Sequence, residues 1–189
     1  MVCFDEKSYQ LLADSRQGLP LQPRRADYEY RRRGTRTLFM MVEPLAGQRS
    51  VLLTKRRTKA DFAHAVRYLV DVLYPNAMCI ELVLDNLNTH TYRALVETFA
   101  ILEAKRLMRR VCFHYTPVHA SWLNMAEIEI GILSRQCLRR HIPSQQMLGS
   151  ELAAWQQFRN AHSAKIHCSF SLKDARRIFA QYYPEFSPT

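Results

Sequence analysis

Residues 80–90 read IELVLDNLNTH, and this stretch determines what kind of fold the chain can form. The run Ile80 to Leu84 is short and apolar and leads directly into Asp85, as expected for a buried strand with an acidic residue at its carboxyl end. A polar turn follows, in which Thr89 is placed as the N-cap of a helix running towards Arg106. The stretch therefore predicts a strand, an acidic residue at the sheet edge and then a helix.

The residues before this stretch predict three strands and a helix. Val2 to Phe4 is a short apolar run, followed by a polar segment from Asp14 to Gly34 that indicates a loop. Two further apolar runs flank turn residues as in a hairpin, and apolar residues then recur at three- and four-residue spacings, typical of an amphipathic helix. These segments are Thr37 to Val42, Ser50 to Thr54 and Thr58 to Leu73.

The residues after the stretch complete the predicted order of elements. Val111 to Tyr115 indicates a strand, and a stripe of apolar residues predicts a helix from Leu123 to Arg140. Two further helices are expected over Glu151 to Arg159 and Leu172 to Tyr182. This order predicts an α/β fold with a central mixed five-stranded sheet flanked by helices, which is the order of an RNase H-like fold. We expect residues 1–189 to form one domain.

The charge of the chain favours a polyanionic partner. Lys and Arg total 27 against 17 Asp and Glu, which gives a formal net charge of +10 and a pI of about 9.7. Nucleic acid is the leading partner, although a basic balance also keeps a protein soluble. Basic residues flank the predicted hairpin, where they could bind phosphates or form solvated loops: Arg24, Arg25, Arg31, Arg32, Arg33, Lys55, Arg56 and Arg57. Trp122 could stack on a base or serve as a packing anchor.

Cysteine usage and hydropathy bear on the cellular compartment. The five cysteines are scattered and form no C-x-x-C pair, so neither a zinc knuckle nor a disulfide framework is indicated. Charged residues interrupt every long apolar segment, and Asp5 and Glu6 stand where a signal peptide would be apolar. We expect a soluble, cytoplasmic protein with buried free thiols, no membrane partner and no small-molecule substrate.

Three acidic residues can converge in such a fold. Asp5 ends the first predicted strand and Asp85 ends the strand after the first helix, so their carboxylates meet if the two strands are parallel neighbours. Glu127 lies in the first turns of a helix that can pack across the same edge. Three convergent carboxylates suffice to bind divalent metal ions, and two such ions can activate a nucleophile and stabilise the leaving oxygen in phosphodiester cleavage.

Each of these residues also has a simpler interpretation. Asp85 can be a turn former or a helix cap, and Asp5 a solvated loop acid. A carboxylate at Glu127 is favoured by the helix dipole in any case. Periodicity does not choose between Glu127 and Glu129, because both project off the apolar stripe on opposite sides.

Three motifs carry a resemblance to a known family: CFDE at residues 3–6, VLDNLNTH at 83–90 and YTPVHASWLNMAEIE at 115–129. In these motifs the chain resembles the DDE transposases of the mariner-like superfamily, specifically their bacterial insertion-sequence branch. The similarity continues through further segments and covers nearly the whole chain: DYEYRRRGTRTLFMMVEPLAG at 27–47, LSRQCLRR at 133–140 and FSLKDARR at 170–177.

The resemblance implies that Asp5, Asp85 and Glu127 are the catalytic and metal-binding residues. The family glutamate follows three residues after the asparagine occupied here by Asn124, which leaves Glu129 as second choice. Enzymes of this family use Mg²⁺ or Mn²⁺ in a two-metal site to nick DNA at the ends of the mobile element. The freed 3′-hydroxyl then attacks target DNA, and a homodimer holds the two ends.

The resemblance also implies residues that shape the pocket and shows where the chain departs from the family. Asn88 and His90 would lie beside Asp85, although Asn88 can equally be a turn residue and His90 a helix-start residue. Family members carry an amino-terminal helix-turn-helix region, which is expected to be absent here, and Ala120 and Cys168 replace a glycine and an aromatic residue. The alternatives are a truncated, non-catalytic DNA-binding remnant of a transposase and another RNase H-like nuclease, such as a resolvase or an RNA-hybrid hydrolase.

Overall fold

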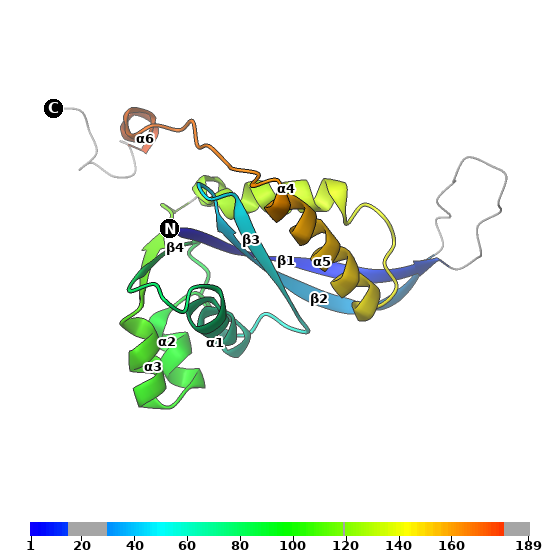
Figure 1. Ribbon diagram of the computed structural model, residues 1–189, viewed down its shortest axis with the longest axis horizontal. Coiled ribbons are helices and arrows are strands. Elements are labelled where there is room, and N and C mark those ends of the chain that lie inside the picture. The colour runs from blue at the N-terminus through cyan, green and yellow to red at the C-terminus, as the bar shows by residue number, and fades with distance from the viewer. Residues whose placement is uncertain (15–29, 119, 180–189) are drawn as a thin grey trace.

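Five strands form one mixed sheet in the computed structural model, which describes residues 1–14, 30–118 and 120–179 (Figure 1). The strands are β1 (Val2–Asp14), β2 (Tyr30–Glu43), β3 (Gln48–Thr54), β4 (Ile80–Leu84) and β5 (Val111–Tyr115). Their order in the sheet is β3-β2-β1-β4-β5. β1, β2 and β3 pair antiparallel, whereas β4 pairs parallel with both β1 and β5. The predicted mixed five-stranded sheet is confirmed.

The strand β1 is longer than its apolar content predicts. The strand expected over Val2 to Phe4 continues to Asp14, because the polar residues that follow Phe4 pair with β2 along its length. The expected loop from Asp14 to Gly34 was therefore wrong at both ends, since Asp14 and residues 30–34 belong to strands. Residues 15–29 lie outside the described residues.

A glycine makes the turn between β2 and β3 possible. Gly47 has a φ of +68°, and its N–H donates to the carbonyl of Glu43 at 2.9 Å. A Cβ atom at this position would approach the carbonyl carbon and oxygen of Ser163 to 2.4 Å. Only glycine combines this left-handed backbone with so close an approach.

Helices cover one face of the sheet below the strands in Figure 1. α1 (Lys59–Tyr68) begins with a capping box, in which Thr58 and Asp61 exchange side-chain and main-chain hydrogen bonds, and it continues as the π-helical η1 (Leu69–Leu73). These two segments match the predicted helix. The core on this face contains Phe4, Phe39, Met41, Phe62, Val66, Leu69, Leu82, Leu84 and Leu95.

The helix expected from Thr89 towards Arg106 is instead two helices, α2 (Tyr92–Thr98) and α3 (Ile101–Met108). The N-cap position of α2 is Thr91, not Thr89. The start is shifted because the N–H of His90 donates to the carbonyl of Leu87 at 2.9 Å and closes a turn there. Phe99, with extended backbone angles, separates the two helices.

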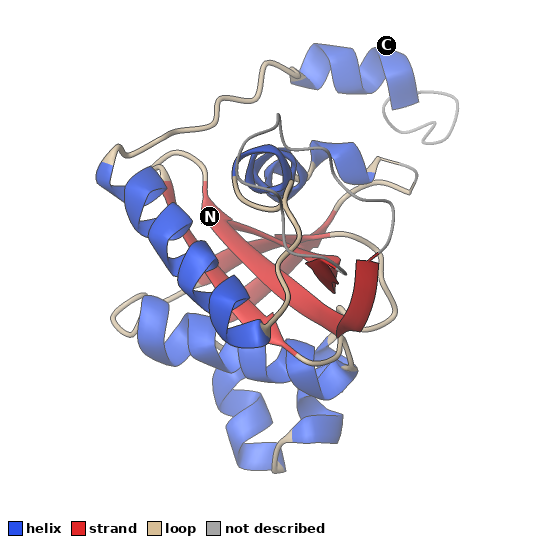
Figure 2. Cartoon of the chain, turned by 90° about the vertical axis from the view of Figure 1, so that its right-hand side faces the viewer, coloured by secondary structure: helices blue, strands red, loops and turns tan. Residues whose placement is uncertain are grey.

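Two helices pack on the opposite face of the sheet, so the strands lie between two helical layers (Figure 2). The expected helix from Leu123 to Arg140 is the 3₁₀ turn η2 (Ser121–Leu123) followed by α4 (Met125–Gln136), because Asn124 between them has an extended backbone and caps α4. α5 (Gln145–Ala161) begins before the predicted Glu151, since Ser144 supplies its cap. The core on this face includes Cys3, Leu38, Met40, Val42, Leu133, Leu148, Leu152 and Trp155.

The C-terminal helix α6 (Leu172–Phe179) follows an extended segment. Its predicted end at Tyr182 lies outside the described residues. No helix in the described ranges combines the length and apolar character that crossing a membrane requires. The expectation of buried thiols was partly wrong: Cys3 and Cys137 are buried and Cys112 is half-buried, whereas Cys79 and Cys168 are exposed. Cys79 precedes β4, and Cys168 lies outside regular structure.

Candidate active site

Asp5 and Asp85 are brought together by the parallel pairing of β1 and β4. Val2 pairs with Leu82 and Cys3 with Val83, and continuing this register by two residues places Asp5 beside Asp85. Asp85 follows the last residue of β4, as predicted. Asp5 does not end its strand, contrary to expectation, because β1 runs on against β2. Asp5 and Asp85 therefore lie together where β4 ends, and not at the end of β1.

Asn124 fixes the first turn of α4 against β1. Its side chain is fully buried; Nδ2 donates to the carbonyl of Phe4 at 2.8 Å, and Oδ1 accepts from the N–H of Ala126 at 3.2 Å. Because Phe4 directly precedes Asp5, this link sets the position of the α4 N-terminus relative to Asp5. Glu127 lies in that first turn and is exposed.

Burial and neighbouring charges raise the pKa of Asp5. Burial of this side chain, which is 8% exposed, is the main cause that raises its pKa from 3.8 to about 7. The N–H of Glu6 donates to Oδ1 at 2.7 Å and opposes this rise, whereas the negative charges of Asp85 and Glu127 add to it. The charges of Asp85 and Glu127 thus disfavour ionisation of Asp5, an effect that a bound cation would relieve.

The three carboxylates do not form a single tight coordination sphere. Within the described ranges, the one group of at least three His, Cys, Asp or Glu ligand atoms lying within 4.8 Å of one another is Glu81, Cys112 and His114, on β4 and β5. Asp5, Asp85 and Glu127 offer hard carboxylate oxygens, the type of ligand that divalent ions such as Mg²⁺ and Mn²⁺ bind.

His90 connects the side chains of Asp85 and Glu6 by hydrogen bonds. Its Nδ1 lies 2.6 Å from Asp85 Oδ1 and its Nε2 lies 2.7 Å from Glu6 Oε2. The ring is fully buried and packs against the rings of Phe4 and Phe62. Burial alone would lower the pKa of His90, but the hydrogen bonds to the two carboxylates outweigh it and raise the pKa to about 9. Both ring nitrogens therefore donate at neutral pH.

Glu6 is the residue of this arrangement that the sequence analysis missed. Side chains of successive strand residues point to opposite faces, so Glu6 lies on the α1 side of β1 while Asp5 lies on the α4 side. The sequence does contain an indication of this role. Asp5 and Glu6 are adjacent in a strand, so one of them must face the apolar α1 side and needs a buried partner there.

Glu129 occupies a different environment from Glu127. It is fully buried, and its carboxylate accepts from Arg159 Nε and Nη2, both at 2.9 Å. Arg49 Nε lies 3.1 Å from Glu129 Oε1 and is also fully buried. Glu129 therefore joins α4 to β3 and α5, whereas Glu127 influences Asp5.

The residues expected to bind DNA lie in different parts of the molecule. Arg57 is near the acidic residues, since its Nη1 lies 3.9 Å from Glu6 Oε1 while its side chain stays 61% exposed. Its neighbour Arg56 is exposed as well. Arg31, Arg32 and Arg33 are exposed on the far end of β2, roughly 20 Å or more along the strands from Asp5. Arg24 and Arg25 lie outside the described residues.

Two further residues that were predicted for the site, Asn88 and Trp122, have different surroundings. Asn88 is exposed in the turn after β4. Trp122 is 48% exposed, and its ring lies 5.0 Å from that of Phe170 and 6.5 Å from that of Phe179. The packing role of Trp122, one of the two alternatives, is thus present in the structure.

The comparisons with known proteins identify the family and the fold of the chain. The family model described as DDE superfamily endonuclease matches residues 1–149, which is most of the chain. The chain therefore belongs to the DDE superfamily endonucleases. No curated protein matches the chain in sequence at a significant level.

Among solved structures, the chain is similar to a transposase. The crystal structure of the Mos1 mariner paired end complex with Mn matches with a TM-score of 0.52 at 17% identity, covering 86% of this chain and 51% of that chain. The Mos1 transposase paired-end complex with left transposon end matches at 0.51 with the same identity and coverage. The likeness shows that the chain has the RNase H-like fold of Mos1 transposase, and the chain spans about half the length of the Mos1 chains.

Proposed function

We propose that this chain is the catalytic domain of a transposase, a metal-dependent endonuclease and strand transferase acting on the DNA ends of a bacterial insertion sequence of the mariner-like superfamily. The observation that carries the proposal is the meeting of Asp5 with Asp85 in the β1–β4 register, with the charge of Glu127 acting on Asp5. Membership of the DDE superfamily endonucleases supports it.

Asp5, Asp85 and Glu127 would hold two Mg²⁺ or Mn²⁺ ions. Such ions, when bound, activate the attacking oxygen and neutralise charge on the phosphate and leaving group. The protein's own part is positional. His90 hydrogen-bonds Oδ1 of Asp85 and so orients this carboxylate, and Asn124 holds the first turn of α4 beside β1. Metal ligands oriented by such hydrogen bonds lose less freedom on binding.

DNA is the proposed substrate. Arg56 and Arg57 follow β3 near the acidic residues, where they can bind phosphates next to the scissile bond, and Arg31 to Arg33 can bind DNA further along. The Mos1 structures are named as paired-end complexes, one of them with a transposon end. This supports a homodimer that holds two DNA ends here as well.

The test is metal-dependent nicking of duplex DNA by the purified chain, compared with Asp85→Asn and Glu127→Gln. Glu97→Gln is the matched control, because Glu97 is an exposed acid on α2 that pairs with the surface residues Lys59 and Arg93. Loss of nicking in both site variants but not in the control supports the proposal. DNA binding without nicking would favour the non-catalytic remnant, and preferred cleavage of branched DNA or RNA–DNA hybrid another RNase H-like nuclease.

A further inference from the structure

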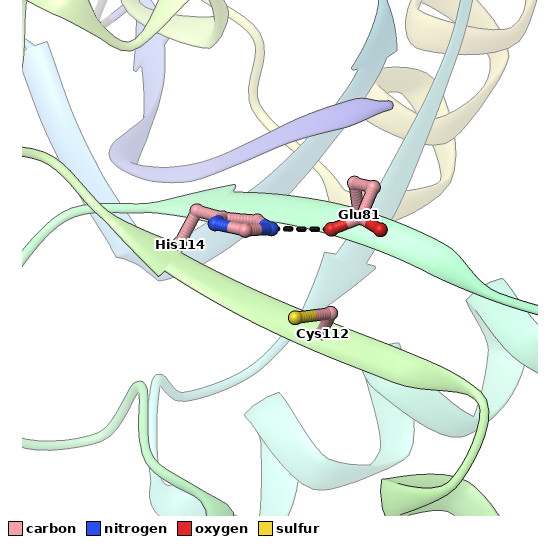
Figure 3. A group of neighbouring side chains, drawn as sticks. All are labelled: Glu81, Cys112 and His114. Carbon is pink, nitrogen blue, oxygen red and sulfur yellow. Dashed lines mark hydrogen bonds and ion pairs between the residues drawn. The ribbon is translucent and has the colours of Figure 1, made fainter.

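Three side chains of types that bind metal ions, Glu81, Cys112 and His114, lie together on β4 and β5 (Figure 3). They are separate from Asp5, Asp85 and Glu127, called the DDE residues below. Glu81 pairs directly with Cys112 in the parallel β4–β5 register, and His114 is two residues further along β5. Alternate residues of a strand share a face, so these three side chains project from one side of the sheet. Their neighbours Ile80, Leu82, Val111 and Phe113 pack in the α1–α3 core on the other side.

The potential ligand atoms converge on a small volume. One atom each from Glu81, Cys112 and His114 lies within 4.8 Å of the other two. His114 Nε2 and Glu81 Oε2 are in direct contact, and Figure 3 shows these two side chains pointing toward each other with the Cys112 thiol beside them. Cys79, one residue before β4, adds a fourth atom, because its Sγ lies 3.8 Å from Glu81 Oε1.

We propose that Cys79, Glu81, Cys112 and His114 form a structural Zn²⁺ site. Two thiolates, an imidazole and a carboxylate are ligands that Zn²⁺ takes in tetrahedral geometry at about 2.0–2.3 Å, which places ligand atoms about 3.3–3.8 Å apart. The ligand atoms of Glu81, Cys112 and His114 lie within 4.8 Å of one another, and Cys79 Sγ lies 3.8 Å from Glu81 Oε1, so small movements of these side chains would bring four atoms to that spacing. Soft sulfur ligands disfavour Mg²⁺, so this site and the all-oxygen DDE residues would select different ions.

The position of the site gives it a structural role. β5 is the edge strand of the sheet and is only five residues long, and β4 is equally short. A metal ion bound by residues of both strands would fix their register at the exposed side, where Glu81 and His114 are about half exposed. β4 leads directly to Asp85, so the same ion would steady the strand that positions this residue. The inference does not depend on the proposed function.

The pattern explains why the cysteines did not indicate a zinc site in the sequence. Zinc ligands in knuckles are paired as C-x-x-C within one turn, whereas here the pairs are C-x-E and C-x-H on neighbouring strands, at residues 79–81 and 112–114. Only the strand register brings the two pairs together.

The experiment is titration of the fully reduced chain with Co²⁺ as a spectroscopic substitute for Zn²⁺, followed by displacement with Zn²⁺. Tetrahedral Co²⁺ with thiolate ligands gives intense visible d–d bands and a thiolate charge-transfer band, which oxygen-only sites lack. The variants are Cys79→Ser, Cys112→Ser and His114→Gln. Cys168→Ser controls for loss of an exposed thiol elsewhere, and Asp5→Asn controls for metal binding at the DDE residues.

The expected result is a thiolate band that saturates at one equivalent of Co²⁺ per chain and that Zn²⁺ abolishes. Affinity should fall on the order of 100-fold or more in Cys112→Ser and His114→Gln, and stay unchanged in both controls. Circular dichroism of each variant reports whether it folds, and Cys79→Ser, which lies outside the strands, tests the site with the least effect on folding. Absence of a thiolate band in the folded wild-type chain, or a band that survives Cys112→Ser, would overturn the inference.

Discussion

The side-chain amide of Asn124 donates a hydrogen bond from Nδ2 to the main-chain carbonyl of Phe4 at 2.8 Å, across the boundary between α4 and β1. The same side chain caps α4 through Oδ1. One residue thus ties the strand that carries Asp5 to the helix that carries Glu127. The relative position of two acidic residues far apart in the sequence depends on this bond.

Asn124→Ala should lower the free energy of unfolding by about 2–3 kcal/mol, because it removes a helix cap and leaves the buried Phe4 carbonyl without its donor. Asn124→Asp separates the two effects. It keeps the acceptor for Ala126 N–H but turns a carboxylate oxygen toward the Phe4 carbonyl, so we expect it to be destabilised at least as much. Urea denaturation measures both, with Ser144→Ala, the exposed cap of α5, as a control that costs about 1 kcal/mol. An Asp variant as stable as wild type would show that the bond to Phe4 contributes nothing.

The buried acid Asp5 should make stability depend on pH in the absence of metal. Its pKa is raised from 3.8 in the unfolded chain to about 7 in the folded one. Below about pH 4 it is protonated in both states; as the pH rises to about 7 only the unfolded state ionises, so the folded state progressively loses stability, by up to about 4 kcal/mol. Asp5→Asn removes this penalty and keeps an acceptor for the N–H of Glu6.

The measurement is chemical denaturation of wild type and Asp5→Asn in a chelating buffer across this pH range. We expect equal stability at about pH 4 and a more stable variant at about pH 8. Added Mn²⁺ should stabilise wild type alone at the higher pH, because the ion binds the ionised carboxylate. Equal stability of the two proteins at every pH would contradict the raised pKa of Asp5.

The parts of this architecture that were predictable from sequence are those set by local burial. β4 and β5 match their predicted bounds because their apolar residues, among them Ile80, Leu82, Leu84 and Val111, pack in the core on one face of the sheet. The length of β1 could not be predicted, since the pairing with β2, a distant part of the chain, makes its polar residues a strand. For the same reason the partnership of Glu6 with His90 was not foreseen. The residues are 84 positions apart and meet only in the folded protein.

His90 should tune the metal affinity of the proposed site. His90→Gln keeps a polar side chain but loses the donor pair that holds Asp85 Oδ1 and Glu6 Oε2 together. We expect the affinity for Mn²⁺ to fall by about 10–100-fold, the usual effect of removing a group that orients a metal ligand. Isothermal titration with Mn²⁺ measures it. His64→Gln, on the exposed side of α1, is the control, and an unchanged affinity in His90→Gln would exclude the orienting role.

The two glutamates of α4 should have different roles, Glu129 in stability and Glu127 in activity. Glu129→Gln leaves Arg49 and Arg159 without their buried counter-charge, so we expect a loss of about 3–5 kcal/mol in the free energy of unfolding. Glu127→Gln changes an exposed side chain and should alter stability by less than about 0.5 kcal/mol.

The rate of DNA nicking should fall in Glu127→Gln and not in folded Glu129→Gln, the reverse of the expected effects on stability. Glu127→Gln should lower the rate by several orders of magnitude, because it removes a proposed metal ligand while the fold stays intact. Glu129→Gln, assayed well below its unfolding temperature, should retain nicking in proportion to its folded fraction. Measuring the nicking rate and the unfolding curve on the same preparation distinguishes a loss of catalysis from a loss of folded protein. A Glu127→Gln protein that is stable and fully active, beside a folded but inactive Glu129→Gln, would reverse the assignment and make Glu129 the third acidic residue of the site.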